Sequence, residues 1–336
     1  MSDLILEVRD LVVDIPVATG MLHPVQSISF DVTRGETLCI VGESGCGKSL
    51  TSLAVMDLLP STATCTASVL KLDDEDLQSV GEKRMTDIRG NKMAMIFQEP
   101  MTSLNPAYTI GNQLEEALLR HKKVSAAEAR DRAIYLLEKV GITAAASRLT
   151  QYPHQLSGGL RQRVMIAMAL MCGPDLIIAD EPTTALDVTI QAQILHLLAD
   201  LQKEFNMGMI LITHDLGVVA RVADRVAVMY AGQIVETGTA KQVFENPTHP
   251  YTQGLLECIP IPGKTERGAP LGSIPGIVPS LVGDLPGCHF ADRCAHVMDA
   301  CRTGRIDLRD SFEDGHVFRC LLTPDQSAAN LKRGAA

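Results

Sequence analysis

A glycine-rich stretch near the N-terminus has the residue types and spacing of a phosphate-binding loop. It follows an apolar run that reads as a strand, residues 37–41, and it precedes residues 50–56, which read as a helix. Backbone N–H groups of such a loop can surround phosphate oxygens, and the helix N-terminus adds a partial positive charge. The stretch therefore predicts a nucleoside triphosphate site with contacts from Gly42, Ser44, Gly45, Cys46, Gly47, Lys48, Ser49 and Leu50.

Two carboxylates at the end of a second apolar run suit phosphoryl transfer. Residues 176–181 end in Asp180 and Glu181. Asp180 is expected to hold Mg²⁺ through water, with the Ser49 hydroxyl as a second ligand, while Lys48 reaches the β- and γ-phosphates. Glu181 is expected to polarise the attacking water as the general base.

Two further strand ends carry polar side chains. Gln98 ends residues 93–97 at the ligand edge of the predicted parallel sheet, where it is expected to act in catalysis and on Mg²⁺. His214 ends the run 209–213 and is expected to orient the γ-phosphate and the water. A surface strand end with two solvated acids is the alternative interpretation of Asp180 and Glu181, and a structural histidine is the alternative interpretation of His214.

A Ser-Gly-Gly sequence begins another predicted helix. Ser157 is a natural N-cap, and Gly158 and Gly159 allow an anion to approach the helix N-terminus closely. We therefore expect these three residues to contact phosphate.

The elements that must position these residues predict an α/β fold. Several short alternating strands are expected over residues 4–41, which indicates an antiparallel sheet beside the parallel one. Residues 110–141 have helical periodicity and separate the phosphate loop from the later motifs.

Composition limits the partners and the location. A net charge of −10 and a pI of about 5.4 argue against binding to nucleic acid. We find neither a signal-peptide pattern nor an apolar run long enough to span a membrane. The chain is therefore expected to be cytoplasmic and to act at a membrane through partners.

Taken together, the motifs resemble the ATP-binding cassette (ABC) ATPases over about residues 4–245. The resemblance implies a P-loop fold with a RecA-like core, an antiparallel β subdomain and a helical subdomain over about residues 100–165. It also implies head-to-tail dimers, in which each ATP lies between the phosphate loop of one subunit and the signature of the other. The motifs run in the order Walker A 42–49, Q-loop Gln98, signature 156–160, Walker B 176–181, D-loop 185–187 and switch His214.

Two positions depart from the pattern of that family. ABC cassettes usually stack adenine on an aromatic ring near the first strands, but no Phe, Tyr or Trp precedes Phe30. Ile15 is expected at that position, with His23 as an alternative. Loss of the stack would cost on the order of 1–3 kcal/mol. The signature ends in Leu160 in place of the usual Gln, which resembles the peptide-importer branch.

Residues 246–256 also look like the hallmark of dipeptide and oligopeptide importer ATPases. The resemblance implies an ATPase, a translocase subunit, that binds two permease chains at the cytoplasmic face of the bacterial membrane. A second, related ATPase and an extracellular or periplasmic solute-binding protein complete the expected assembly. Alternatives are a nickel, opine or glycoside importer, or a soluble ABC ATPase outside transport. We expect a boundary between an ATP-binding domain, 1–245, and an accessory region, 246–336.

Four cysteines follow a connector over residues 260–287 that is rich in Pro and Gly. Because disulfides are disfavoured in the cytosol, a metal site is the natural interpretation. The spacing fits an iron–sulfur cluster about as well as zinc. The resemblance to peptide-importer ATPases favours a [4Fe–4S] cluster bound by Cys288, Cys294, Cys301 and Cys320. Unligated cysteines and a Zn²⁺ site are the alternatives.

Overall fold

The computed structural model describes residues 3–184, 186–259 and 272–334. Ala185 of the predicted D-loop and residues 260–271 of the predicted connector lie outside the described residues. The chain divides into two compact units. The first comprises Met1–Glu7, Asp31–Thr37 and Lys71–Ile212, and the second comprises Val8–Phe30, Leu38–Leu70 and Thr213–Ala336. The boundary expected after residue 245 stays a prediction.

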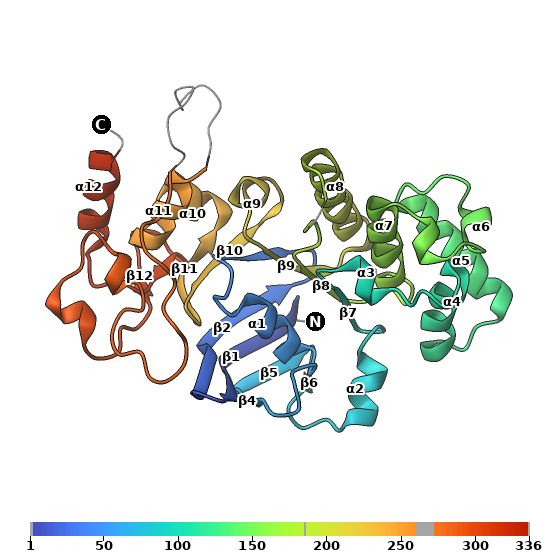
Figure 1. The fold of residues 1–336 in the computed structure, drawn as a ribbon, viewed down its shortest axis with the longest axis horizontal. Coiled ribbons are helices and arrows are strands. Elements are labelled where there is room, and N and C mark those ends of the chain that lie inside the picture. The colour runs from blue at the N-terminus through green and yellow to red at the C-terminus, as the bar shows by residue number, and fades with distance from the viewer. Residues whose placement is uncertain (1–2, 185, 260–271, 335–336) are drawn as a thin grey trace. The chain divides into compact units, whose positions relative to one another are not determined.

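Two long strands of 14 residues each, β1 (Leu4–Val17) and β2 (Gly20–Thr33), form a hairpin (Figure 1). The prediction of several short strands was wrong here. Asp10 and Ser27 interrupt the apolar pattern, but both adopt left-handed backbone conformations, with φ of 50° and 51°. The Ser27 hydroxyl donates to Asp10 Oδ1 at 3.2 Å, so the irregularity is accommodated within two continuous strands.

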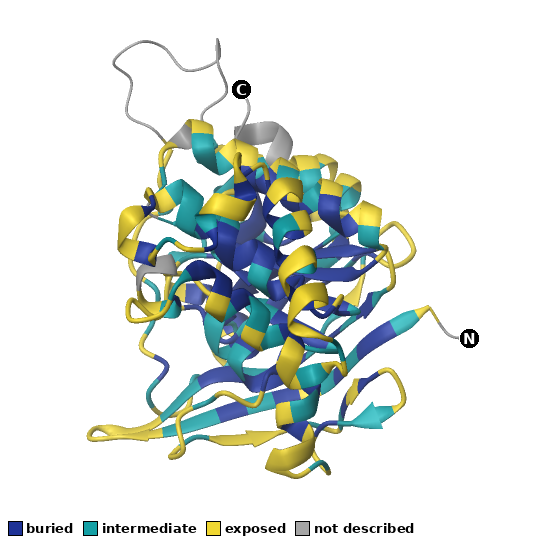
Figure 2. Cartoon of the chain, turned by 90° about the vertical axis from the view of Figure 1, so that its right-hand side faces the viewer, coloured by how far each residue is buried: buried dark blue, intermediate teal, exposed yellow. Residues whose placement is uncertain are grey.

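The first unit contains three parallel strands in the order β9 (Gly208–Thr213), β8 (Leu176–Asp180) and β7 (Met93–Ile96). Every residue of β8 and β9 is buried. Figure 2 shows dark blue, buried strands behind helices whose outer residues are yellow and exposed. Burial on both faces explains why these strands read as continuous apolar runs without alternation. A short antiparallel pair, β5 (Val69–Leu72) and β6 (Glu75–Asp76), precedes β7 in the chain.

Helices follow these strands in the first unit. Helix α4 packs on α5, and both contact α7. A capping box begins α5, in which Ser125 and Glu128 satisfy each other's backbone N–H groups. The helices are α2 (Glu82–Ile88), α3 (Pro100–Ser103), α4 (Ile110–His121), α5 (Ala126–Lys139), α6 (Ala145–Arg148), the 3-10 turn η1 (Pro153–Gln155), α7 (Gly158–Ala169) and α8 (Val188–Phe205).

The second unit has its own strands, in the order β12 (Arg309–Asp310), β13 (Val317–Phe318), β11 (Gln233–Thr239), β10 (Arg225–Tyr230) and β3 (Thr37–Val41). Strands β10 and β3 are parallel, whereas the pairs β10–β11, β11–β13 and β12–β13 are antiparallel. Strand β4 (Thr64–Thr66) pairs with β1. The helices are α1 (Lys48–Val55), α9 (Leu216–Val222), α10 (Ala240–Glu245), α11 (Pro250–Glu257) and α12 (Pro324–Gly334), with 3-10 turns η2 (Ala291–Arg293) and η3 (Asp299–Arg302).

The C-terminal segment, which we define as residues 246–336, joins its unit through a buried carboxylate. Glu236 of β11 is fully buried and accepts hydrogen bonds from the Thr248 N–H at 2.7 Å, the His249 N–H at 2.8 Å and His316 Nε2 at 2.8 Å. Burial alone would raise the pKa of this carboxyl, but these hydrogen bonds outweigh it and lower the pKa. The Glu236 carboxylate therefore links β11 to residues 248–249 and to His316.

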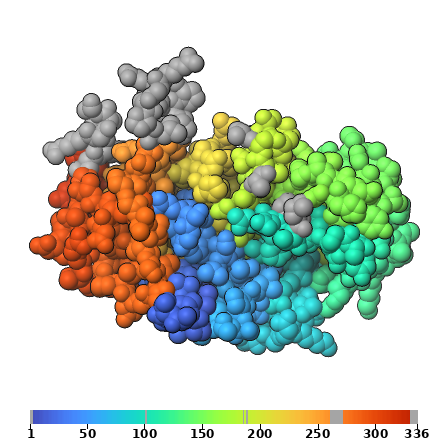
Figure 3. Space-filling view, viewed as in Figure 1, coloured from blue at the N-terminus to red at the C-terminus, as the bar shows by residue number. Residues whose placement is uncertain are grey.

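The same segment also contacts the N-terminal hairpin. The His23 N–H donates to Leu281 O and the Gly283 N–H donates to Met21 O, both at 2.8 Å. Figure 3 shows the orange residues of the segment next to the dark blue hairpin. Among the described residues, we find no helix long and apolar enough to cross a membrane.

Candidate functional site

The predicted phosphate loop connects β3 to α1 in the second unit. Its close packing explains the glycines. A β-carbon at Gly42 would lie 2.1 Å from Met229 O, and one at Gly47, where φ is 101°, would lie 2.0 Å from Pro24 O. Only glycine fits such contacts. The loop is therefore pressed against the backbone of β10 and β2.

Lys48, the first residue of α1, is 4% exposed. Its Nζ donates to Gly42 O at 2.8 Å and to Glu43 O at 3.0 Å, so the ammonium group lies inside the curve of the loop. Ser49 follows it on the first turn of α1. An ammonium group and a helix N-terminus within one loop form a suitable receptor for phosphate.

The first unit brings together Gln98 and Glu181. Gln98 Nε2 donates to Glu181 Oε2 at 3.2 Å, and the Thr184 hydroxyl donates to the same oxygen at 2.9 Å. Glu181 has a left-handed backbone, with φ of 42°, and its N–H donates to Ile212 O of β9 at 2.9 Å. Asp180, the last residue of β8, is 5% exposed. Thr184 was missed as a functional residue because hydroxyls are common in turns.

The Ser-Gly-Gly sequence begins α7 as predicted. Ser157 is its N-cap, and the Ser157 hydroxyl accepts from the Leu160 N–H at 3.4 Å. A β-carbon at Gly159 would meet Ile190 of α8 at 3.2 Å, and one at Gly158 would meet Leu186 at 3.8 Å. The start of α7 therefore packs on the segment that follows Glu181 in the chain.

His214 lies in the second unit, exposed between β9 and α9. The next residue, Asp215, caps α9 by accepting from the Gly217 and Val218 N–H groups at 2.9 and 3.3 Å. The cap fixes the backbone directly after His214.

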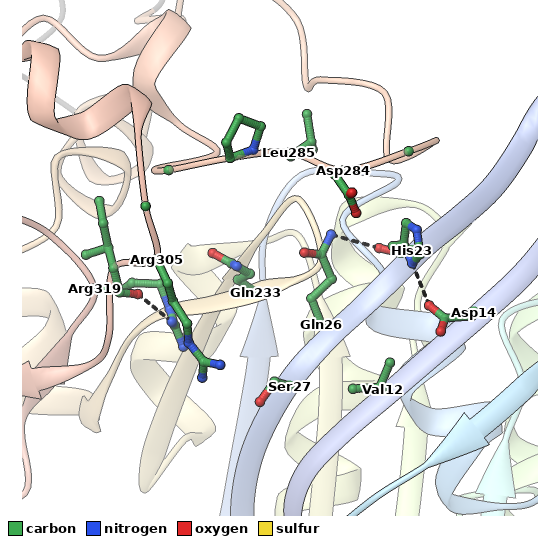
Figure 4. Close-up of a pocket in the computed structure, with 15 residues that line it drawn as sticks. Val12, Asp14, His23, Gln26, Ser27, Gln233, Asp284, Leu285, Arg305 and Arg319 are labelled. Carbon is green, nitrogen blue, oxygen red and sulfur yellow. Dashed lines mark hydrogen bonds and ion pairs between the residues drawn. The ribbon is translucent and has the colours of Figure 1, made fainter.

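His23, the alternative to Ile15 for contacting adenine, lines a cavity of about 480 Å³ in the second unit. Figure 4 shows its ring directed toward Asp14, whose Oδ1 lies 2.6 Å from His23 Nδ1. Val12 and Asp14 line the same cavity, whereas Ile15 is not among the lining residues. Because side chains alternate along a strand, Ile15 lies on the opposite face of β1 from Asp14.

The four C-terminal cysteines line one cavity, but the prediction that they bind a [4Fe–4S] cluster was wrong. Among the described residues, no group of three or more His, Cys, Asp or Glu side chains could hold a metal ion. The cavity has a volume of about 10 Å³, which is room for about one water molecule. Burial raises the pKa of Cys288 to about 12 and also raises the pKa values of Cys294 and Cys320. The alternative Zn²⁺ site gains no support either.

Comparison with protein-family models matches residues 25–184 to ABC transporter and residues 235–301 to the C-terminal region of oligopeptide/dipeptide transporters. The dipeptide transport ATP-binding protein DppD of Bacillus subtilis is 53% identical over 334 residues, which are 99% of this chain and 98% of DppD. The oligopeptide transport ATP-binding protein OppD of the same organism is 51% identical over 96% of this chain and 90% of OppD. Both relatives are named as ATP-binding proteins of peptide transport.

Solved structures show the same cassette fold. The dimeric post-hydrolysis structure of the ATP-binding cassette MJ0796, bound to ADP and Pi, is similar with a TM-score of 0.62 and 26% identity. It covers 70% of this chain and 98% of that one. The cbiO1 protein of Clostridium perfringens, part of a cbiONQ ABC transporter complex, is similar with a TM-score of 0.61 and 28% identity over 72% of this chain and 91% of cbiO1.

Proposed function

We propose that this chain, which belongs to the ATP-binding proteins of the oligopeptide and dipeptide ABC transporters, hydrolyses ATP to energise the import of short peptides. One observation carries the proposal. The 53% identity to a dipeptide transport protein extends over 334 residues, so it includes the C-terminal segment as well as the nucleotide motifs.

The proposed nucleotide contacts follow from the sequence motifs. Lys48 and the backbone of residues 42–50 bind the phosphates, and Ile15 contacts adenine in place of an aromatic ring. Ser49, Gln98 and Asp180 offer oxygen atoms, the ligands that Mg²⁺ prefers, so the donor set fits this cation. When bound, Mg²⁺ would supply positive charge that offsets the negative charge of the triphosphate.

Glu181 acts as the general base. As water attacks the γ-phosphorus, its proton passes to the Glu181 carboxylate, the bond to the oxygen that bridges the β-phosphate breaks, and ADP and inorganic phosphate form. The hydrogen bonds that Gln98 and Thr184 donate to Oε2 support this role, because they orient the carboxylate. His214 orients the γ-phosphate and the water.

Hydrolysis depends on a second ATPase subunit. Ser157, Gly158 and Gly159 at the start of α7 contact the γ-phosphate bound by the partner, which makes turnover conditional on closure of the dimer. The dimeric, ADP-bound state of the similar cassette supports this arrangement. We expect the second ATPase to be a different, related chain.

The remaining partners follow from peptide import. Two membrane-spanning permease chains and a periplasmic or extracellular solute-binding protein complete the transporter, and the ATPase lies at the cytoplasmic face of the membrane. Residues 246–336 form an accessory region of this subunit, which the match to residues 235–301 supports.

The test is an ATPase and uptake assay on the assembled transporter in membrane vesicles. Hydrolysis should rise when the solute-binding protein delivers a peptide, and peptide should accumulate with ATP consumption. A soluble ABC ATPase would give a different result. Its ATPase activity would not rise when peptide is added, and the chain would co-purify with ribosomes or DNA in place of permeases.

A further inference from the structure

Glu43, the second residue of the phosphate loop, is anchored by two residues of the C-terminal segment. Its backbone N–H donates to the Tyr251 hydroxyl oxygen at 2.9 Å, across 208 positions of the sequence. Its carboxylate accepts two hydrogen bonds from Arg293, at 2.5 and 3.0 Å, across 250 positions. Backbone and side chain of one loop residue are thus both held by the same distant segment.

The Arg293 guanidinium is fully engaged. Besides the two bonds to Glu43, it donates to the Tyr230 hydroxyl at 3.4 Å, to Ile274 O at 3.0 Å and to Pro275 O at 2.9 Å. Together these contacts use all five N–H donors of an arginine. The side chain is 4% exposed. The hydrogen bonds to Glu43 raise the pKa of Arg293 further, so the guanidinium stays charged.

Aromatic packing makes this anchor rigid. The Tyr230 and Tyr251 rings have centroids 4.5 Å apart, and Phe290 packs edge-on against Tyr230 at 5.2 Å. Tyr230 and Tyr251 are fully buried, and Phe290 is buried. The hydroxyl groups that contact Glu43 and Arg293 are therefore fixed in place by a closed cluster of rings.

The anchor bears directly on the lysine that is expected to bind phosphate. Glu43 O accepts a hydrogen bond from Lys48 Nζ at 3.0 Å, so a shift of Glu43 also moves a partner of the ammonium group. In addition, the Glu43 carboxylate would repel phosphate if it were not neutralised, and Arg293 supplies the opposite charge. An ion pair with a purely structural role would neither position a partner of Lys48 nor reduce the repulsion between Glu43 and phosphate.

We propose that Arg293, supported by Tyr251, is a positioning residue of the nucleotide site, which fixes Glu43 and neutralises its charge so that the phosphate loop is organised to bind ATP. The inference rests on the proposed ATPase function. It gives the C-terminal segment a role in nucleotide affinity.

The experiment measures KM for ATP and kcat of the assembled transporter with Arg293→Met, Arg293→Lys, Glu43→Gln and the double variant Arg293→Met/Glu43→Gln. Arg293→Met should raise KM about tenfold and change kcat less than about twofold, because the interaction acts on binding. Arg293→Lys keeps the charge but loses the paired hydrogen bonds to Glu43, so it should raise KM less than Arg293→Met does. The double variant should bind ATP more tightly than Arg293→Met, because it removes the uncompensated carboxylate.

Arg302→Met provides the matched control. Arg302 also lies in the C-terminal segment and pairs with Asp292 at 2.6 Å, but on the exposed surface, so KM should stay unchanged. If Arg293→Met fails to fold, as judged by thermal unfolding, Tyr251→Phe and Arg293→Lys provide the test through smaller increases in KM. An unchanged KM in folded variants, a loss confined to kcat, or a double variant no better than Arg293→Met would overturn the inference. A wild-type transporter without ATPase activity would instead contradict the proposed function.

Discussion

Gln98 and Glu181 lie at the ends of two adjacent parallel strands, where Gln98 Nε2 donates a 3.2 Å hydrogen bond to Glu181 Oε2. The pairing of β7 with β8 places Ile96 opposite Ala179, so the residues two positions further along each strand also meet. The Thr184 hydroxyl shares the same carboxylate oxygen at 2.9 Å. The sheet register thus places an amide next to the proposed general base.

We predict that Gln98→Leu and Thr184→Val each lower kcat by about tenfold, because each removes one hydrogen bond that orients the Glu181 carboxylate. Single-turnover ATP hydrolysis measures this effect apart from product release. Because both groups contact one oxygen, the double variant should lose more than either single variant but depart from additivity. Strict additivity would mean that the two groups act separately.

Lys48→Met should weaken ATP binding at least about tenfold, since it removes the charged donor expected at the β- and γ-phosphates. Equilibrium binding of a fluorescent ATP analogue to the full chain measures this loss. The variant also leaves Gly42 O and Glu43 O without the ammonium group that contacts them, so thermal unfolding should be recorded alongside. Unchanged affinity in a folded Lys48→Met protein would contradict the assignment of the phosphate loop.

Gly47→Ala should destabilise the fold by at least about 2 kcal/mol more than Gly173→Ala. Both glycines have positive φ, at 101° and 65°, so both variants incur backbone strain. The added β-carbon, however, would lie 2.0 Å from Pro24 O at Gly47, whereas it would meet nothing within 4 Å at Gly173. Urea unfolding of the two variants measures the difference in the free energy of unfolding. Equal losses of stability would mean that the close packing around Gly47 does not contribute to the stability of the fold.

Acid should destabilise the C-terminal segment through His249. Burial lowers the pKa of His249 from 6.5 to about 4. The unfolded chain therefore binds a proton between about pH 6.5 and pH 4 that the folded chain does not, so stability is lost as pH falls through this range. The full shift corresponds to about 3 kcal/mol. Unfolding free energies at pH 7 and pH 4.5 measure it.

His249→Asn is the control for that prediction. His249 Nδ1 accepts from the Tyr251 N–H at 3.0 Å at the start of α11, and Asn can replace this cap without titrating. The variant should therefore lose less stability than the wild type between the two pH values. An equal loss would assign the acid sensitivity to other groups.

The strands and the helix start that carry the candidate site residues could be predicted from sequence because they lie in short contiguous patterns. The run before Gly42 and the run that ends in Asp180 are continuously apolar, since buried parallel strands need no alternation, and each is followed directly by its polar group. The N-cap role of Ser157 was predicted for the same reason and is confirmed. Apolar runs and N-caps can be recognised in this way because they depend only on residues that are adjacent in the sequence.

Long-range relationships could not be predicted in this way. No local pattern connects Glu43 with Arg293, because their contact depends on how the C-terminal segment folds back across 250 positions. The continuity of β1 and β2 was missed because polar residues, among them Asp10 and Ser27, separate the apolar runs. The cysteine spacing correctly suggested a shared location, but it could not indicate that the enclosed volume is about 10 Å³.

The central claim is that Glu181 is the base of an ATPase that powers peptide uptake. The most direct test compares wild type with Glu181→Gln in the assembled transporter and measures ATP binding, phosphate release and peptide uptake together. We predict near wild-type ATP affinity, phosphate release reduced by about 10²–10⁴-fold, and no uptake. Phosphate release at the wild-type rate by a folded, ATP-bound Glu181→Gln transporter would contradict the account.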